Sequence, residues 1–135
     1  MNLILDNNIL FSLMNPHSMT SFIFLDLNAI LFAPEFIIEE FNRYEEECRK
    51  KSKLDKFKFA ERKKVIFSKI NFLKLKDFNS FVEPARKFCP GENDVFYFAL
   101  ALELKAPIWS NDKELKNQNK VVVLDTRDII NLYLS

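Results

Sequence analysis

Short apolar runs of strand length alternate with longer segments of helical pattern, and this alternation constrains the fold more than any other feature of the sequence. Leu3-Ile4-Leu5 is fully apolar, which is typical of a strand covered on both faces, as in a parallel sheet. Four further strands are predicted at residues 30–32, 72–75, 108–110 and 121–124. The alternation therefore predicts an α/β fold with a central, mostly parallel five-stranded sheet.

The segments between these runs carry helix signals. Pro34 is suited to the first turn of a helix, and the residues after it form one apolar stripe on which Glu40 also lies. The segment 54–70 has a helical apolar pattern within a strongly basic sequence. Helices are predicted from residue 7 or 8 to 14, over 18–28, from 34 to about 44, and over 54–70, 78–88 and 95–105, with further helix starts near residues 111 and 126.

The length and composition indicate one globular domain. A chain of 135 residues suits a single core, and we expect one domain over residues 1–135. Hydrophobic residues make up 48% and charged residues 29%, which is typical of a soluble protein. No apolar run approaches the roughly 20 residues needed to cross a bilayer. The chain starts without a basic leader and leads directly into the first strand, so we expect no signal peptide and a cytoplasmic protein.

The sequence lacks the residues that several kinds of catalytic and cofactor-binding site require. The two cysteines, Cys48 and Cys89, have no zinc-type spacing, and the one histidine, His17, lies beside a proline in a predicted surface turn. The single glycine, Gly91, cannot supply a Walker loop or a dinucleotide-binding turn. Any catalysis must therefore depend mainly on carboxylates.

Carboxylates stand at the carboxyl ends of predicted strands, where open parallel sheets bind ligands. Asp6 ends the first strand and Asp112 follows the strand at 108–110. Asp94 begins the helix that leads into the strand at 108–110. Such a helix must start at the carboxyl edge of a parallel sheet, so Asp94 is expected at that edge too. Each acid could instead be a helix cap or a first-turn acid. For Asp6 a functional role is favoured, because a carboxylate that ends a buried strand is costly unless it is paired, hydrogen-bonded or metal-bound.

Four segments of the chain resemble, in order, the sequence motifs of PIN-domain proteins. They are Leu3–Leu10, Pro34–Phe41, the acidic turn Glu92–Asp94 ahead of Phe98–Leu102, and Ile108–Asp112. Glu40 fits the second motif better than Glu39, because an apolar residue follows it. The chain departs from the family pattern at Asn7, where a small hydroxyl residue is more usual, and in its longer basic stretch.

The resemblance implies a three-layer α/β/α fold with helices on both sides of the sheet, and one shared pocket for the four acids. Oxygen ligands without His or Cys favour Mg²⁺ or Mn²⁺. We expect Asp6, Asp94 and Asp112 to hold the metal, and Glu40 to bind a second ion or to position a water. Asn8 and Ser110 are expected to orient ligands or phosphate, and Glu114 is a further candidate. The implied activity is hydrolysis of RNA by a metal-dependent endoribonuclease.

The segment between Arg49 and Lys64 contains nine basic residues against two acids. This charge could belong to a solvated helix surface or to a surface that contacts phosphate. An acidic pocket repels RNA, so positive charge close to it is needed to hold single-stranded or structured RNA. The expected RNA contacts are Arg49, Lys50, Lys51, Lys53, Arg62, Lys63 and Lys64.

Other functions stay open beside the nuclease. The resemblance implies a homodimer, and either an RNA-processing nuclease or the toxin of a toxin-antitoxin pair with an antitoxin protein as partner. A non-catalytic module for RNA binding or assembly on the same fold is the first alternative, and the presence of all four acids argues against it. A phosphohydrolase or phospho-acceptor on another α/β fold, with Asp6 as nucleophile, is weakened because Asn8 stands where many such enzymes have a second Asp.

Overall fold

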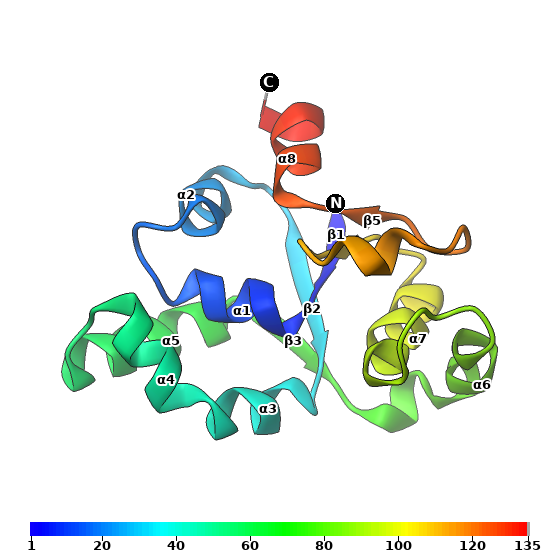
Figure 1. Ribbon diagram of the computed structural model, residues 1–135, viewed down its shortest axis with the longest axis horizontal. Helices are drawn as coiled ribbons and strands as arrows, with labels where there is room; N and C mark the ends of the chain where they lie inside the picture. The colour runs from blue at the N-terminus through cyan, green and yellow to red at the C-terminus, as the bar shows by residue number, and fades with distance from the viewer. Residues whose placement is uncertain (135) are drawn as a thin grey trace.

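Five parallel strands form one sheet in the computed structural model, which describes residues 1–134 (Figure 1). The strands run in the order β3-β2-β1-β4-β5. Their bounds are β1 (Asn2–Leu5), β2 (Ile30–Pro34), β3 (Ile70–Leu73), β4 (Ile108–Trp109) and β5 (Val123–Leu124). The predicted α/β fold is confirmed, and all four strand pairings are parallel. Ser135, the last residue of the predicted domain, lies outside the described residues.

Helices cover both faces of the sheet (Figure 1). One side carries the helices from the first half of the chain, and the other carries α6 and α7. The α-helices are α1 (Asn7–Leu13), α2 (Met19–Asp26), α3 (Ile37–Arg43), α4 (Glu45–Ser52), α5 (Lys56–Ser68), α6 (Val82–Arg86), α7 (Val95–Leu104) and α8 (Thr126–Ile129). Short 3-10 turns span Leu75–Asp77, Asn79–Phe81, Glu92–Asp94 and Lys113–Lys116, and a π-helical turn, Ile130–Leu134, extends α8. None of the helices within residues 1–134 is long and apolar enough to cross a membrane.

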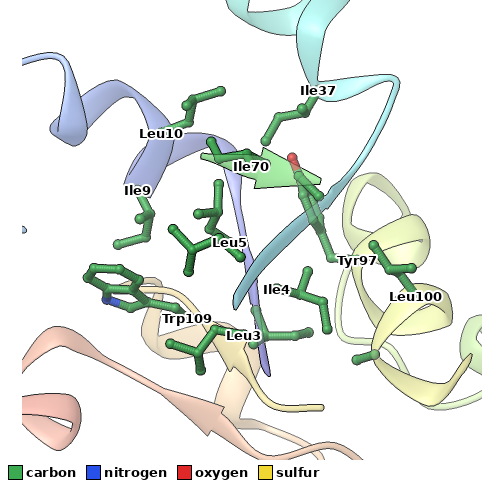
Figure 2. Close-up of a cluster of buried hydrophobic side chains, with 14 of the residues drawn as sticks. Leu3, Ile4, Leu5, Ile9, Leu10, Ile37, Ile70, Tyr97, Leu100 and Trp109 are labelled. Carbon is green, nitrogen blue, oxygen red and sulfur yellow. The ribbon is translucent and has the colours of Figure 1, made fainter. Parts of the chain in front are cut away.

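The core is centred on β1. Leu3, Ile4 and Leu5 are fully buried, as the unbroken apolar run predicts. Figure 2 shows these side chains between residues of α1 on one side and Tyr97 and Leu100 of α7 on the other. β1 is thus a central strand, and the residue that follows it is placed at the middle of the carboxyl edge of the sheet.

Several predicted strand and helix boundaries are wrong, and the fifth strand begins at Val123 instead of residue 121. Pro34 does not begin a helix: it is the last residue of β2 and pairs with Leu73 of β3, and α3 begins only at Ile37. A proline is tolerated at this point because the ladder no longer needs its missing N–H, and the next residue, Glu35, donates instead to the carbonyl of Leu73 (2.7 Å). The third strand also begins two residues earlier than predicted, because α5 already ends at Ser68.

The basic segment forms two helices, of which only the second was predicted. α4 is terminated by the residue that follows it, Lys53, whose backbone is left-handed (φ 57°). Asp55 then begins α5 by accepting a hydrogen bond from the backbone of Lys58 (2.8 Å). The predicted helix over 78–88 is instead a 3-10 turn followed by α6, with Pro84 in the first turn, where no N–H is needed. The expected helix start near 111 is likewise a 3-10 turn, whereas α8 begins at Thr126 as predicted.

Candidate active site

One pocket of about 330 Å³ brings together the four acids that were expected from the sequence. Asp6 follows β1, Asp94 ends the turn before α7, Asp112 follows β4, and Glu40 comes from α3. The other lining residues are Asn7, Asn8, Arg43, Tyr44, Asn93 and Tyr97. We call this the acidic pocket. Its position at the carboxyl edge agrees with the general location of ligand sites in parallel sheets.

Asp6 is the buried, fixed member of the pocket. One carboxylate oxygen accepts a hydrogen bond from the backbone of Ile9 (3.0 Å) and so begins α1, and the other accepts from the Ser110 hydroxyl. Burial raises the pKa of Asp6, the two hydrogen bonds oppose this effect, and the charge of Asp112 adds to it. Asp6 therefore caps a helix and lines the pocket at the same time.

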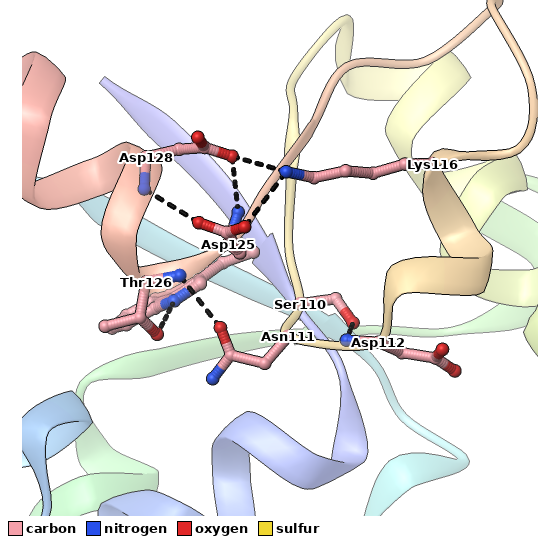
Figure 3. Close-up of polar contacts among 8 residues, drawn as sticks. Ser110, Asn111, Asp112, Lys116, Asp125, Thr126 and Asp128 are labelled. Atoms are coloured by element: carbon pink, nitrogen blue, oxygen red, sulfur yellow. Dashed lines mark hydrogen bonds and ion pairs between the residues drawn. The ribbon is translucent and has the colours of Figure 1, made fainter.

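The loop after β4 holds Ser110 and Asp112 in place (Figure 3). The Ser110 hydroxyl oxygen accepts a hydrogen bond from the backbone of Asp112 (3.1 Å), and the Asp112 carboxylate begins the following 3-10 turn by accepting from the backbone of Glu114 (3.0 Å). The side-chain oxygen of Asn111 accepts from the backbone of Thr126 (2.8 Å), which ties this loop to α8. Asp112 itself is exposed, so its carboxylate is the one most open to solvent.

Asp94 is the acid with the strongest electrostatic perturbation. It is half-buried, and its carboxylate makes no hydrogen bond or ion pair with any other residue in the part of the chain that the structure describes. Burial is the largest cause that raises its pKa to about 6, followed by repulsion from Asp112, Asp6, Glu40 and Glu114. The repulsion from all three other pocket acids shows that the four carboxylates share one electrostatic environment.

Glu40 also lines the acidic pocket and comes from the first turn of α3. Its carboxylate accepts a hydrogen bond from the side-chain amide of Asn7 (2.6 Å). Burial raises the pKa of Glu40, while the charge of Arg43 and the hydrogen bond from Asn7 oppose the increase. Arg43 is the cation among the pocket-lining residues, so it offsets only part of the negative charge.

A family model described as a PIN domain matches residues 4–134. The chain belongs to the PIN-domain family. Among solved structures, the crystal structure of VapBC2 from Rickettsia felis bound to a DNA fragment from its promoter has a similar fold, with a TM-score of 0.69 and 16% sequence identity. The similarity covers 93% of this chain and 98% of the other. No curated protein matches the chain in sequence.

Five residues that line the pocket of this PIN domain were not predicted from the sequence, namely Asn7, Arg43, Tyr44, Asn93 and Tyr97. Asn7, and not Asn8, makes the hydrogen bond to a pocket acid, although both line the pocket. Arg43 lies one helical turn after Glu40, and Tyr97 lies one turn after Asp94, so helical spacing from the acids could have indicated both. The exposed Glu114 does not line the pocket and acts on Asp94 only through its charge.

The basic residues expected to contact RNA divide into two groups. Arg49 pairs with Glu46, Lys63 pairs with Glu45 (3.0 Å), and Arg62 donates to the backbone carbonyl of Leu13 (2.8 Å), so these three stabilise the packing of α4 and α5. The remaining four, Lys50, Lys51, Lys53 and Lys64, are exposed, and of these Lys51 forms an exposed ion pair with Glu47 (3.1 Å). A role in RNA binding is thus better suited to the exposed group.

Two polar atoms of the pocket walls are buried without a hydrogen-bond partner among the described residues. They are the side-chain oxygen of Asn7 and the hydroxyl of Tyr97. Tyr97 is only 3% exposed, and its pKa is raised first by burial and then by the nearby charges of Glu40, Asp6 and Asp94. A buried hydroxyl without a partner destabilises the fold, because its hydration is lost without replacement.

Replacing Tyr97 by Phe is therefore expected to raise the free energy of unfolding by about 1 kcal/mol, because only the unpaired hydroxyl is removed. Urea unfolding followed by circular dichroism measures the change, and Tyr133→Phe, on an exposed tyrosine far from the pocket, is the control. A decrease of 1 kcal/mol or more in Tyr97→Phe would contradict the expectation and would mean that a bound water or the nearby backbone N–H of Asn7 satisfies the hydroxyl.

Proposed function

We propose that this PIN domain is a Mg²⁺- or Mn²⁺-dependent endoribonuclease that hydrolyses phosphodiester bonds in the acidic pocket. The observation that carries the proposal is the concentration of four carboxylates from separate elements in one pocket, where burial and then their repulsion raise the pKa of Asp94 to about 6. A divalent cation would remove this repulsion, and ligands that are all carboxylates suit Mg²⁺ and Mn²⁺.

Asp6, Asp94 and Asp112 would hold the ion. Within residues 1–134, no three side chains of His, Cys, Asp or Glu lie close enough together to ligate one ion as they stand. Binding therefore requires side-chain rotation. Asp94 has no hydrogen-bond partner among the described residues, and the exposed Asp112 carboxylate would exchange its hydrogen bond from the Glu114 backbone (3.0 Å) for the ion. Asp6 is held by Ser110 and Ile9 and would be the fixed point of the site.

A bound cation of this kind would lower the pKa of a water and stabilise the charge that develops on the phosphate. The chain's own groups would position the reactants. Asn7 holds one oxygen of the Glu40 carboxylate (2.6 Å), which leaves the other oxygen to orient the attacking water or to bind a second ion. Ser110 would maintain the orientation of Asp6, and Asn8 would contact the phosphate from the pocket wall.

The substrate class in this proposal is single-stranded or structured RNA. The exposed lysines of α4, α5 and the turn between them, Lys50, Lys51, Lys53 and Lys64, would supply the positive charge that an acidic pocket lacks. In a salt series, RNA affinity should decrease as the salt concentration rises, because each phosphate contact releases counterions.

The decisive experiment is incubation of end-labelled RNAs with the protein in Mg²⁺ or Mn²⁺ and in EDTA. We expect internal cleavage with the cations and none in EDTA. Binding of RNA without cleavage under every metal condition would overturn the nuclease proposal and favour the non-catalytic RNA-binding or assembly module.

The pH dependence of stability provides a test that needs no substrate. Folding raises the Asp94 pKa from its ordinary value of 3.8 to about 6, so the folded state binds more protons than the unfolded state between these pH values. The contribution of Asp94 to the free energy of unfolding in EDTA should therefore be fully present below about pH 4 and be lost as the pH rises through 6, by about 1–2 kcal/mol after allowance for solvent screening of this half-buried group.

Chemical unfolding in EDTA at pH 4.5 and pH 7.5 measures this component, and Asp94→Asn should lack it. Saturating Mg²⁺ or Mn²⁺ should restore stability at pH 7.5 in the parent but not in Asp94→Asn, because a ligand that binds only the folded state stabilises it. Equal pH dependence in the parent and the variant would contradict the role of Asp94.

The partners belong to the same proposal. The VapBC2 structure of similar fold is bound to DNA from its promoter. We infer that this protein acts either as the toxin of a toxin-antitoxin pair, with an antitoxin protein as partner, or as an RNA-processing nuclease, and that it forms a homodimer. The exposed apolar residues of α2, Met19, Phe22 and Leu25, offer a surface for association. Light scattering measures the oligomeric state, and growth arrest on expression that Asp94→Asn relieves would support the toxin.

A further inference from the structure

A second cavity, of about 490 Å³, adjoins the acidic pocket. Its lining residues come from α1, the loop after α1, Tyr44 and α4, and we call it the α1–α4 cavity. Three residues, Asn7, Asn8 and Tyr44, line both the α1–α4 cavity and the acidic pocket. A ligand in the α1–α4 cavity would therefore lie directly beside the group that reacts in the acidic pocket.

One wall of the α1–α4 cavity offers an aromatic surface. The Tyr44 side chain is 47% exposed, although it is a large aromatic residue between two helices. Its ring meets the Phe11 ring edge-on, with 6.4 Å between centroids and 87° between the planes. Phe11 is already stacked on Phe41 (5.4 Å), whereas Tyr44 has no stacked partner among the described aromatic residues. Tyr44 can thus stack on a planar ligand.

The same cavity is also lined by polar side chains that can form hydrogen bonds with a ligand. The side chains of Asn8 and Ser12 make no hydrogen bond with other described residues, and Asn15 uses only its oxygen, which accepts from the backbone of His17 (3.0 Å). Donors and acceptors are therefore available on three side chains. Lys51 adds a positive charge at the rim, where it also pairs with Glu47 (3.1 Å).

A nucleobase matches this combination. It has a planar face for the Tyr44 ring and an edge of donors and acceptors for carboxamide and hydroxyl groups, which is the way proteins recognise unpaired RNA bases. The volume of the cavity falls within the range of small-ligand sites. An apolar helix of a protein partner would bury Asn8, Ser12 and Asn15 without satisfying their polar atoms, so it matches the cavity less well.

We propose that the α1–α4 cavity binds one unpaired base of the RNA substrate, stacked on Tyr44, in the nucleotide next to the bond that is cleaved. This inference rests on the proposed nuclease function and adds a base-binding subsite to it. The shared residues Asn7, Asn8 and Tyr44 place the phosphate of that nucleotide on the side of the acidic pocket. Because a base inside a duplex cannot enter the cavity, the subsite makes cleavage dependent on an unpaired nucleotide at this position.

The test compares an RNA with the same RNA that lacks the base next to the cleaved bond. For the intact RNA, Tyr44→Ala should lower kcat/KM by about 10-fold or more, which is typical of a lost stacking contact. Removal of the base should lower kcat/KM of the parent by a similar factor and have no further effect on Tyr44→Ala. Tyr133→Ala is the matched control, since Tyr133 is 46% exposed and lies outside both cavities. Independent, additive losses would overturn the subsite.

A second variant guards against misfolding of Tyr44→Ala. Ser12 lines only the α1–α4 cavity, so Ser12→Leu narrows it without removing any group from the acidic pocket. Ser12→Leu should reduce cleavage of the intact RNA about 10-fold and leave the slower cleavage of the base-free RNA unchanged. An equal reduction for both RNAs would overturn the subsite.

A binding measurement separates this inference from the proposed function. In Asp94→Asn, which should bind RNA without cutting it, a fluorescent base analogue at the same position should be quenched on binding, and Ser12→Leu should abolish the quenching.

Cleavage by the parent without any effect of base removal would overturn the subsite and leave the nuclease proposal standing. If the fluorescence of the base analogue is quenched in Asp94→Asn but not after Ser12→Leu, and the parent does not cleave RNA, the base-binding subsite is supported and the nuclease proposal is overturned. Binding of a protein partner that Ser12→Leu blocks, with both RNA measurements unchanged, would also overturn the subsite.

Discussion

Replacement of Asp94 by Asn is expected to lower the rate of metal-dependent RNA cleavage by about 100- to 1,000-fold. The change keeps the shape of the side chain but removes one negative charge from the acidic pocket, where Asp94 has no hydrogen-bond partner in the described chain. The loss should appear mainly in kcat, because the proposed RNA contacts lie on the exposed lysines. Single-turnover cleavage of labelled RNA in Mn²⁺ measures the effect.

Asp94 is a cleaner target than Asp6. Asp6→Asn would also disturb the hydrogen bonds that begin α1 and bind Ser110, so a loss of activity could result from a loss of folding. Glu61→Gln is the matched control for Asp94→Asn, because it removes one acid from the exposed surface of α5. Cleavage by Asp94→Asn within about two-fold of Glu61→Gln would contradict the assignment of the acidic pocket as the active site, since loss of a charged group there should cost far more.

Replacement of Trp109 by Ala is expected to lower the free energy of unfolding by about 3–5 kcal/mol. Trp109 is fully buried in β4, and its indole N–H donates a hydrogen bond to the Thr126 hydroxyl (3.1 Å). The variant would leave a large cavity and an unpaired hydroxyl. Small domains are stable by only about 5–15 kcal/mol in total, so this loss would remove a large part of the free energy of unfolding.

Urea unfolding of Trp109→Ala and Trp109→Phe tests this expectation. The Phe variant keeps most of the buried ring but loses the hydrogen bond, so it should lose less stability than the Ala variant. A loss below about 1 kcal/mol in Trp109→Ala would show that β4 lies outside the cooperative core. Such a result would also argue against a fixed position of Asp6, because Ser110 directly follows β4 and donates a hydrogen bond to Asp6.

Much of the fold follows from local sequence patterns. The unbroken apolar run of β1 predicts a central strand, and a strand that ends in a polar residue places Asp6 at the carboxyl edge. The same argument places Asp94 and Asp112 there, because chain direction in a parallel sheet fixes the edge at which each connection begins. Glu40 required the family resemblance, because the orientation of α3 depends on packing and not on its own sequence.

The helix ends were harder to predict because the usual signal is missing. Helices often end at a glycine in the left-handed conformation, but this chain has one glycine. Lysines take that conformation instead, at Lys53 after α4 and at Lys105 after α7. The break between α4 and α5 was therefore invisible in a segment rich in lysine.

The roles of the basic residues also depend on distant parts of the chain. Arg62 donates to the carbonyl of Leu13 and to the hydroxyl of Ser21, both more than 40 residues away. Lys63 lies over the rings of Phe41 and Phe67 at 5.3 and 5.4 Å from their centroids. Charge counting within one segment cannot separate such packing cations from those free to bind RNA.

The order of the strands has a consequence for synthesis of the protein on the ribosome. β1 is made before its neighbour β4, because β4 and the Ser110 hydroxyl that binds Asp6 come more than 100 residues later in the chain. A growing chain can pair β1 with β2, and β2 with β3, before Asp94 and Asp112 have been made. The acidic pocket is therefore completed only after the segment that carries Asp112 has been made, so the first half of the sheet can form before the site exists.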